Sequence, residues 1–143
     1  YALHEAHDDV RNAYRVVYQA TDAGLEAAVP GNTAADVFRA MNRVLETNGA
    51  KGGQVGRMGH GLGMQLTEWP SNAVFDNTVL ENGMVLTLEP GMQFGANKLM
   101  VHEENLVIRD KAVGCDWKKR SKKTLRHCCG GEKWMKRVLK SLK

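Results

Sequence analysis

A single histidine set among glycines is the first feature of this sequence that could do chemistry. His60 lies in "MGHGLGM", residues 58–64, with Gly59 and Gly61 on either side. Glycine has no Cβ, so backbone or a bound group can approach closely at such positions. The imidazole could therefore face something held against the backbone. A glycine-rich turn that carries an ordinary polar residue explains so short a motif equally well.

Three carboxylates inside apolar, strand-like sequence are the second such feature. They are Glu89 in "VLTLEPG" and the adjacent Glu103 and Glu104 in "MVHEENLVI". An ionised carboxylate is costly to bury without a partner, so each of these residues is either paired, bound to metal or solvated on an exposed strand face. One histidine with two or three glutamates is a ligand set suited to Mn²⁺, Fe²⁺, Co²⁺ or Zn²⁺.

Two amphipathic helices are expected ahead of these residues. Apolar residues recur with helical spacing from Val10 to Ala28. After the break at "VPGNT", Thr33 is expected to cap a second helix, with Asp36 three residues later completing a capping box. Gly49 is expected to end that helix. Both apolar stripes are expected to form core.

Short strands are expected to follow the helices. The candidates are residues 64–68 ("MQLTE"), the run that leads from the Asn82-Gly83 turn to Glu89-Pro90, and a strand from Leu99 to Ile108 after the turn "GANK". Two helices followed by antiparallel strands predict an α+β domain.

Length and overall composition limit the classes of protein to which the chain can belong. The chain has 143 residues, of which 43% are hydrophobic and 25% charged, as is ordinary for a globular domain. No apolar run approaches the roughly 20 residues that span a bilayer, so no membrane partner is expected. The N-terminus shows neither an initiator Met nor a signal peptide, and we expect it to lie in the middle of a longer chain.

Charge divides the chain into two parts. Residues 1–110 contain 8 Lys and Arg against 14 Asp and Glu, whereas residues 111–143 contain 12 against 2. We expect a domain over 1–110 and a basic tail over 111–143 outside the fold. The tail is either an interaction segment or a shifted reading frame, and the abrupt change favours the second. It holds all three cysteines, an odd number with one adjacent pair, which favours a reducing cytoplasm.

The order of the motifs adds a resemblance. "PGNTAADVFRAMNRVLETNG", "GHGLG", "LTEWP", "NGMVLTLEPGM" and "HEENLVI" follow one another as in the pita-bread metallohydrolases. This superfamily includes methionine aminopeptidase, Xaa-Pro aminopeptidase, prolidase and creatinase. The chain resembles the C-terminal part of their catalytic domain over about residues 8–110. The resemblance implies a partial pita-bread fold, with two amphipathic helices packed on an antiparallel sheet.

The resemblance also implies a metal site. His60 matches the family's single histidine ligand, Glu89 its first glutamate ligand, and Glu103 the glutamate that bridges two metals, with Glu104 as the fallback. The family holds two divalent ions (Mn, Co, Zn or Fe). Two aspartates of an upstream hairpin complete its site, and these are expected to precede Tyr1. Glu89 is also a candidate to carry a proton during catalysis.

Thr67 departs from the peptidase pattern. The peptidases place a second histidine there, seven residues after the metal ligand, where it contacts the scissile carbonyl. A threonine hydroxyl can donate a hydrogen bond but cannot titrate near neutral pH. Thr67 is therefore the candidate catalytic residue that puts peptide hydrolysis in doubt. Glu68, Trp69 and Pro70 match the family's E-x-P motif and are expected to shape the substrate pocket.

Three functions remain open at this point. The first is part of a Xaa-Pro-type metallopeptidase, inactive as an isolated fragment, whose water attacks an amide near a free N-terminus. The second is a creatinase-like hydrolase of a small amidine or N-acyl substrate, which Thr67 favours. The third is an inactive binding module whose basic tail contacts RNA or an acidic partner. For the first, a small peptide or amide is the expected partner, nucleic acid is not expected, and a homodimer is possible.

Overall fold

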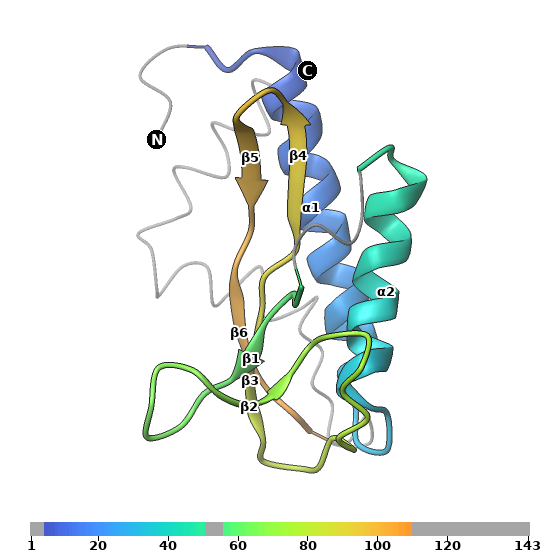
Figure 1. Cartoon of the computed structure of the whole chain (residues 1–143), viewed down its shortest axis with the longest axis vertical. Coiled ribbons are helices and arrows are strands. Elements are labelled where there is room, and N and C mark those ends of the chain that lie inside the picture. Colours follow the sequence, from blue (N-terminus) through green and yellow to red (C-terminus); the bar gives the residue numbers. More distant parts are fainter. Residues whose placement is uncertain (1–4, 51–55, 110–143) are drawn as a thin grey trace. The chain divides into compact units, whose positions relative to one another are not determined.

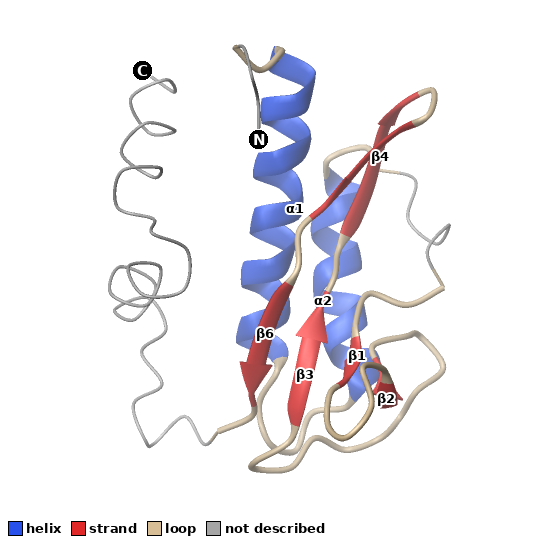
Figure 2. Ribbon diagram, turned by 90° about the vertical axis from the view of Figure 1, so that its left-hand side faces the viewer, coloured by secondary structure: helices blue, strands red, loops and turns tan. Residues whose placement is uncertain are grey.

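Two helices form one layer of the molecule. A computed structural model describes residues 5–50 and 56–109. Helix α1 (Asp8–Ala27) and helix α2 (Ala34–Thr47) lie side by side along one face of the strands (Figures 1 and 2). A Cβ on Gly24 of α1 would lie 2.8 Å from Cγ of Met41 and 3.1 Å from Cδ1 of Leu88. The missing side chain at Gly24 therefore lets α1, α2 and the sheet approach one another.

The periodicity predicted both helices correctly. Each buries the expected apolar stripe and turns its charged residues outward. The capping box is confirmed, because the Thr33 hydroxyl accepts the Asp36 N–H at 3.2 Å and an Asp36 carboxylate oxygen accepts the Thr33 N–H at 2.9 Å. The helix ends as expected before Gly49, whose φ of 77° is a left-handed conformation that suits glycine.

The capping box makes an acid-sensitive contribution to stability. The Thr33 N–H, then Arg39 and the Thr33 hydroxyl, lower the pKa of Asp36 from its ordinary 3.8 to about 2. Because the pKa is lower in the folded state, the contribution is complete above about pH 4 and is lost as the pH falls through 2. Asp36→Ala should cost about 1 kcal/mol at pH 7 in chemical denaturation. The difference from wild type should shrink between about pH 4 and pH 2; a difference that stays constant over that interval would contradict this account.

The strands form two ladders rather than one sheet. A four-stranded antiparallel sheet has the order β2-β1-β3-β6, made of β2 (Glu68–Ser71), β1 (His60–Gly61), β3 (Val85–Leu88) and β6 (Glu104–Val107). A separate hairpin pairs β4 (Gly91–Gly95) with β5 (Lys98–Val101). The helices cover one face of these strands, and the core between them confirms the expected α+β class. Leu86 and Leu88 of β3, and Ile108 directly after β6, are fully buried in this core.

The prediction of one strand from Leu99 to Ile108 is wrong. The β3–β6 ladder ends at the pair Leu88–Glu104, and the β4–β5 ladder begins at the pair Gly91–Val101. Pro90 lies in the gap and has no N–H to donate to a continuing ladder. Its carbonyl oxygen instead accepts the His102 N–H at 3.2 Å. The chain therefore leaves one ladder for the other at two points, after Leu88 and after Val101, and these points face each other. Glu89 lies at the first point and Glu103 at the second.

The prediction of a strand over residues 64–68 is also wrong. These residues form a loop, and β2 begins at Glu68. The Glu68 carboxylate folds back and accepts the Gln65 N–H at 2.6 Å, which closes the loop locally in place of a strand ladder. Strands β1 and β4 were not expected, since β1 has two residues and lies in glycine-rich sequence.

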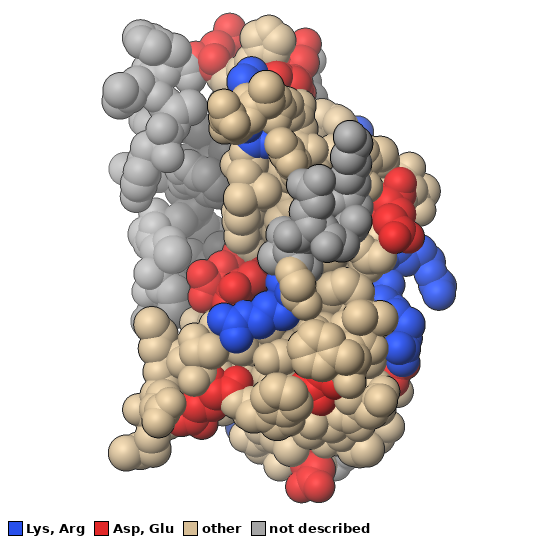
Figure 3. Space-filling view, in the orientation of Figure 1, with Lys and Arg blue, Asp and Glu red and all other residues tan. Residues whose placement is uncertain are grey.

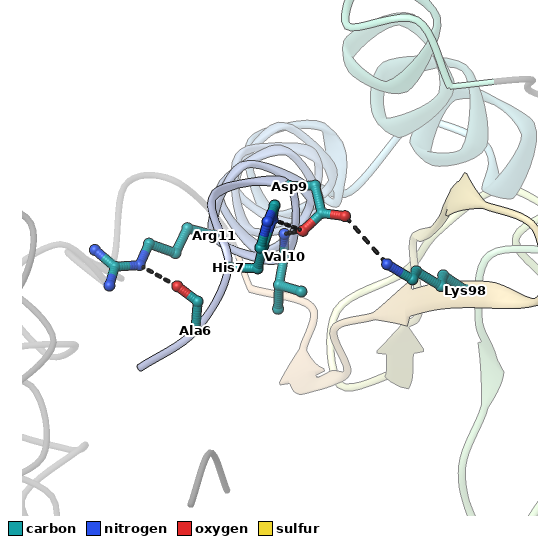
Figure 4. A network of polar contacts seen from close by, with 6 residues as sticks. All are labelled: Ala6, His7, Asp9, Val10, Arg11 and Lys98. Carbon is teal, nitrogen blue, oxygen red and sulfur yellow. Dashed lines mark hydrogen bonds and ion pairs between the residues drawn. The ribbon is translucent and has the colours of Figure 1, made fainter. Parts of the chain in front are cut away.

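Ion pairs join the tip of the β4–β5 hairpin to the start of α1 (Figure 4). The Lys98 ammonium lies 3.3 Å from one carboxylate oxygen of Asp9, and Nδ1 of His7 lies 2.8 Å from the other. Exposed pairs of this kind are screened by solvent and add little to stability. Small groups of both signs are scattered over a mostly uncharged face in Figure 3. The network links the hairpin to α1 locally.

Two expectations concern the chain as a whole, namely membrane crossing and the basic tail. Within residues 5–50 and 56–109, neither helix combines the length and apolar character needed to cross a membrane. The expected basic tail, residues 111–143 with its cysteines, lies outside the described residues. The division of the chain at residue 110 and the nature of that tail stay predictions.

Candidate metal centre

Glycines surround His60 because β1 lies between two other strands. Gly59 has a φ of +124°, and a Cβ there would collide with the carbonyl oxygen of Thr87 and lie 2.8 Å from Nδ2 of Asn72. A Cβ on Gly61 would collide with the carbonyl oxygen of Trp69. The glycines thus let β1 fit against both neighbours, and they place the His60 side chain in the interior, where it is 7% exposed.

The structure brings His60 and Glu89 together. Nε2 of His60 lies 3.0 Å from Oε1 of Glu89, although 29 positions separate the two residues in the sequence. Nδ1 of the same ring lies 2.9 Å from the carbonyl oxygen of Gly61. A carbonyl oxygen can only accept, so Nδ1 carries the proton of this hydrogen bond. In the neutral ring, Nε2 then presents its lone pair to Glu89.

Oε1 of Glu89 is itself an acceptor in this arrangement. The Thr87 hydroxyl donates to it at 2.7 Å, and the same hydroxyl accepts the His60 N–H at 3.0 Å. A nitrogen lone pair and a carboxylate oxygen therefore face each other across 3.0 Å. Two acceptors this close need a cation between them, which is either a proton on Nε2 or a metal ion.

The distance between these two atoms suits a metal. Two ligand atoms about 2.1 Å from one ion and at right angles lie about 3.0 Å apart. The donor set is also suitable, because a neutral imidazole nitrogen and a carboxylate oxygen bind Mn²⁺, Fe²⁺, Co²⁺ or Zn²⁺. The residues present therefore fit the metal that the sequence motifs imply.

Strand register separates Glu103 from Glu104. Glu104 pairs with Leu88 in the β3–β6 ladder, so both side chains lie on the same face, toward the helices. Burial raises the pKa of the Glu104 carboxyl. Burial, and then the charges of Asp22, Tyr14 and Glu104, raise the pKa of Tyr18 on α1. Glu103 directly precedes β6, and continued alternation of side chains would direct it to the opposite face, that of Thr87 and Glu89.

Glu103 is not gathered with the other two expected ligands. In the described part of the chain, no group of three His, Cys, Asp or Glu side chains comes close enough to hold a metal ion. Glu103 is exposed between the two ladders, directly before the first residue of β6. The structure therefore brings His60 and Glu89 together and places Glu103 at the gap between the two ladders, where Glu89 also lies.

The residues expected around a substrate lie in and after the loop that follows His60. Thr67 is exposed in that loop. The Glu68 carboxylate is occupied by the Gln65 N–H, and the Pro70 side chain is buried. Trp69 is 64% exposed, and its Nε1–H donates to the Thr78 hydroxyl at 2.9 Å, which orients the ring. Of this group, Thr67 and Trp69 present exposed surface to a ligand.

Two residues that support the His60–Glu89 pair, Thr87 and Asn72, were not predicted from the sequence. Thr87 is buried between His60 and Glu89, and Asn72 is buried behind it. The Asn72 side chain donates to the carbonyl oxygen of Thr87 at 2.8 Å, and its backbone N–H donates to the carbonyl oxygen of Gly59 at 3.0 Å. One signal was present in the sequence, because Thr87 is a polar residue two positions before Glu89, on the same strand face.

A half-buried histidine, His102, packs against α1 beside the break between the two ladders. Nδ1 of His102 lies 2.9 Å from the Thr21 hydroxyl, and its ring meets those of Tyr14 and Tyr18 edge-on. Burial lowers the pKa of His102. Because the Thr21 hydroxyl donates to the carbonyl oxygen of Val17, it accepts from His102. These contacts tie the β5–β6 junction to α1, on the side away from Glu103.

Comparisons with known proteins agree with this arrangement. Residues 1–110 match metallopeptidase family M24. The chain is 37% identical over 82 residues to a Xaa-Pro dipeptidase of Pyrococcus furiosus, covering 57% of this chain and 24% of that protein. It is 38% identical over 103 residues to a putative dipeptidase, YkvY, of Bacillus subtilis, covering 70% and 28%. A prolidase structure from Pyrococcus furiosus matches with a TM-score of 0.72 at 29% identity, covering 77% of this chain and 33% of that one. The pita-bread fold is thereby confirmed, and the chain spans about a quarter of the length of the curated relatives it matches.

Proposed function

Because the chain belongs to metallopeptidase family M24, we propose that it supplies one side of a dinuclear-metal hydrolase site that cleaves small peptides of the Xaa-Pro type. The observation that carries the proposal is the His60–Glu89 pair, two acceptor atoms 3.0 Å apart that need a cation. The named dipeptidases among the relatives support the substrate class. The activity is proposed for a whole protein that contains this segment.

The proposed ligands are His60 through Nε2, Glu89 and Glu103. Two aspartates outside this segment would complete a site for two divalent ions, whose identity among Mn, Co, Zn and Fe is open. A divalent ion held there would polarise a substrate carbonyl and lower the pKa of a water molecule. A cytoplasmic location and a homodimer remain predictions of the same proposal.

The chain's own residues have distinct tasks in this proposal. The Gly61 carbonyl oxygen holds the His60 ring with its Nε2 lone pair directed at the site. The Thr87 hydroxyl holds one oxygen of Glu89, which leaves the second carboxylate oxygen to accept a proton from the attacking water. Thr67 would donate a hydrogen bond to the substrate carbonyl, and the exposed Trp69 ring would contact the substrate side chain.

The choice of Glu103 over Glu104 can be tested on the 143-residue chain. Glu103→Gln should weaken Co²⁺ binding by about 10-fold or more, because it removes a charged oxygen ligand on the site face. Glu104→Gln should change the affinity by less than about 2-fold, since its side chain lies on the helix face. Isothermal titration calorimetry measures both. The reverse order of effects would assign the ligand to Glu104.

Thr67 favours a second candidate, a creatinase-like hydrolase of a small amidine or N-acyl substrate. Its exposed hydroxyl can stabilise a carbonyl oxygen but cannot protonate a leaving group near neutral pH. The two candidates differ in what a histidine at this position would do. A peptidase should gain from it, whereas a pocket built for another substrate should not.

A graft distinguishes the two candidates. Residues 8–110 would replace the matching segment of the Pyrococcus furiosus Xaa-Pro dipeptidase, with Thr67 kept or changed to histidine. If the pocket is that of a peptidase, the Thr67→His graft should turn over Xaa-Pro dipeptides roughly 10²–10³-fold faster than the Thr67 graft. Metal content and circular dichroism are the controls for a correctly built site. Two folded, metal-loaded grafts that both lack dipeptidase activity would favour the non-peptidase candidate.

A further inference from the structure

One hydroxyl group contacts both members of the candidate metal pair. We propose that Thr87 is a positioning residue, whose hydroxyl fixes the backbone of His60 and the carboxylate of Glu89 in a single arrangement ready for a cation. That the cation is a metal rests on the proposed function. The fixing of the pair rests on the hydrogen bonds alone, and the two can be tested separately.

The direction of each hydrogen bond follows from counting protons. The His60 backbone N–H can only donate, so the Thr87 hydroxyl oxygen accepts it at 3.0 Å. The single hydroxyl proton is then free to point elsewhere, and Oε1 of Glu89 lies 2.7 Å away. A short O–H···O contact of this length is typical of a charge-assisted bond to an ionised carboxylate. One hydroxyl therefore links the ligand-bearing strand β1 to the carboxylate at the end of β3.

Thr87 is itself held in place. Its side chain is 1% exposed, and it pairs with Asn105 in the centre of the β3–β6 ladder. Its carbonyl oxygen accepts from the buried Asn72 amide at 2.8 Å. A β-branched side chain has restricted χ1 freedom, and rotation would leave the buried His60 N–H without its acceptor. The hydroxyl is therefore a fixed reference point between the two ligands.

Removal of the Thr87 hydroxyl should make His60 and Glu89 more mobile without leaving a cavity in the core. Valine has nearly the shape of threonine but cannot accept the His60 N–H or donate to Glu89. Serine keeps the hydroxyl and loses only a methyl group. A purely structural role would respond to the packing change in either variant, whereas a positioning role should separate Thr87→Val from Thr87→Ser.

The first measurement uses the metal-free chain. Thr87→Val should speed hydrogen exchange of the His60 amide and shift the ring ¹⁵N signals of His60 in NMR spectra. Thr87→Ser should leave both close to wild type. Thr47→Val is the matched control, because its hydroxyl donates to the Arg43 carbonyl oxygen at the exposed end of α2. Unchanged His60 signals in Thr87→Val would overturn the inference, and so would equal changes in the valine and serine variants.

The second measurement adds Co²⁺ to the same four proteins. Thr87→Val should bind it 10–100-fold more weakly, as is usual when a group that orients a ligand is lost, and Thr87→Ser should bind within a few-fold of wild type. Wild-type affinity in Thr87→Val would overturn the role toward metal. If the His60 signals respond to Thr87→Val but the wild-type chain binds no Co²⁺, the role of this chain's own pair in holding a metal fails and the positioning of the pair stands.

Discussion

Replacement of His60 by alanine should lower the affinity of this chain for Co²⁺ or Zn²⁺ by more than roughly 100-fold. His60 is the one nitrogen ligand proposed for the site, and the described residues place no second imidazole beside Glu89. Loss of the ring leaves the partly exposed Glu89 carboxylate without its imidazole partner. Isothermal titration calorimetry at constant pH measures the loss directly.

His7→Ala is the matched control for that experiment. Nδ1 of His7 also lies within 2.8 Å of a carboxylate oxygen, that of Asp9, but the pair is exposed at the start of α1 (Figure 4). Its removal should change the metal affinity by less than about 2-fold, because exposed pairs are weak and solvated. An equal loss in both variants would mean that metal binds to any histidine–carboxylate pair on this chain. Retained affinity in His60→Ala would exclude His60 as a ligand.

Gly59→Ala should be the most destabilising small substitution in the described part of the chain. The added Cβ would collide with the carbonyl oxygen of Thr87, part of the β3 backbone that cannot rotate away. It would also require a φ of +124°, which L-residues rarely adopt. Strain and overpacking together should cost about 3 kcal/mol or more in urea denaturation.

Gly83→Ala separates the two causes of that loss. Gly83 also has a positive φ, +92°, but no atom outside its immediate neighbours lies within 4 Å of a Cβ built there. This variant should lose only the conformational preference of glycine, about 1 kcal/mol. If Gly59→Ala costs no more than Gly83→Ala, then β1 does not lie as close to β3 as the structure shows.

The helices could be predicted from the sequence because their signals are local. The capping box joins Thr33 to Asp36, three residues away, and the stop at Gly49 depends on its own backbone conformation. The apolar stripes repeat within one turn and identify the buried faces. None of these features requires knowledge of a distant partner.

The strands were harder to predict because their limits depend on partners far away in the sequence. Residues 99–108 have continuous strand-like character, but the partner changes from β4 to β3 midway, and only the position of Pro90 on the opposite strand hints at it. Strand β1 has two residues and exists because β2 and β3 flank it. Alternation of residue types cannot reveal either fact.

The candidate site was predicted in part for the same reason. Spacing together with the family resemblance named His60 and Glu89, and the structure brings them into contact. The pairing of Glu104 with Leu88 could not be predicted from the sequence, and Glu103 as the third ligand stays a prediction. Thr87 was not predicted as a site residue because threonine is common in strands. The role of its hydroxyl depends on its hydrogen bonds to Glu89 and to His60, which is distant in the sequence.

The ring nitrogens of His60 provide the most direct test of the central claim, that this pair binds a divalent metal. The measurement is the ¹⁵N NMR spectrum of the histidine-labelled 143-residue chain during titration with Zn²⁺. The Nε2 signal should move to the position of a metal-bound nitrogen, while Nδ1 keeps its proton and its bond to the Gly61 carbonyl oxygen. A spectrum in which Nε2 does not respond at saturating Zn²⁺, or in which Nδ1 becomes the bound nitrogen, would contradict the account.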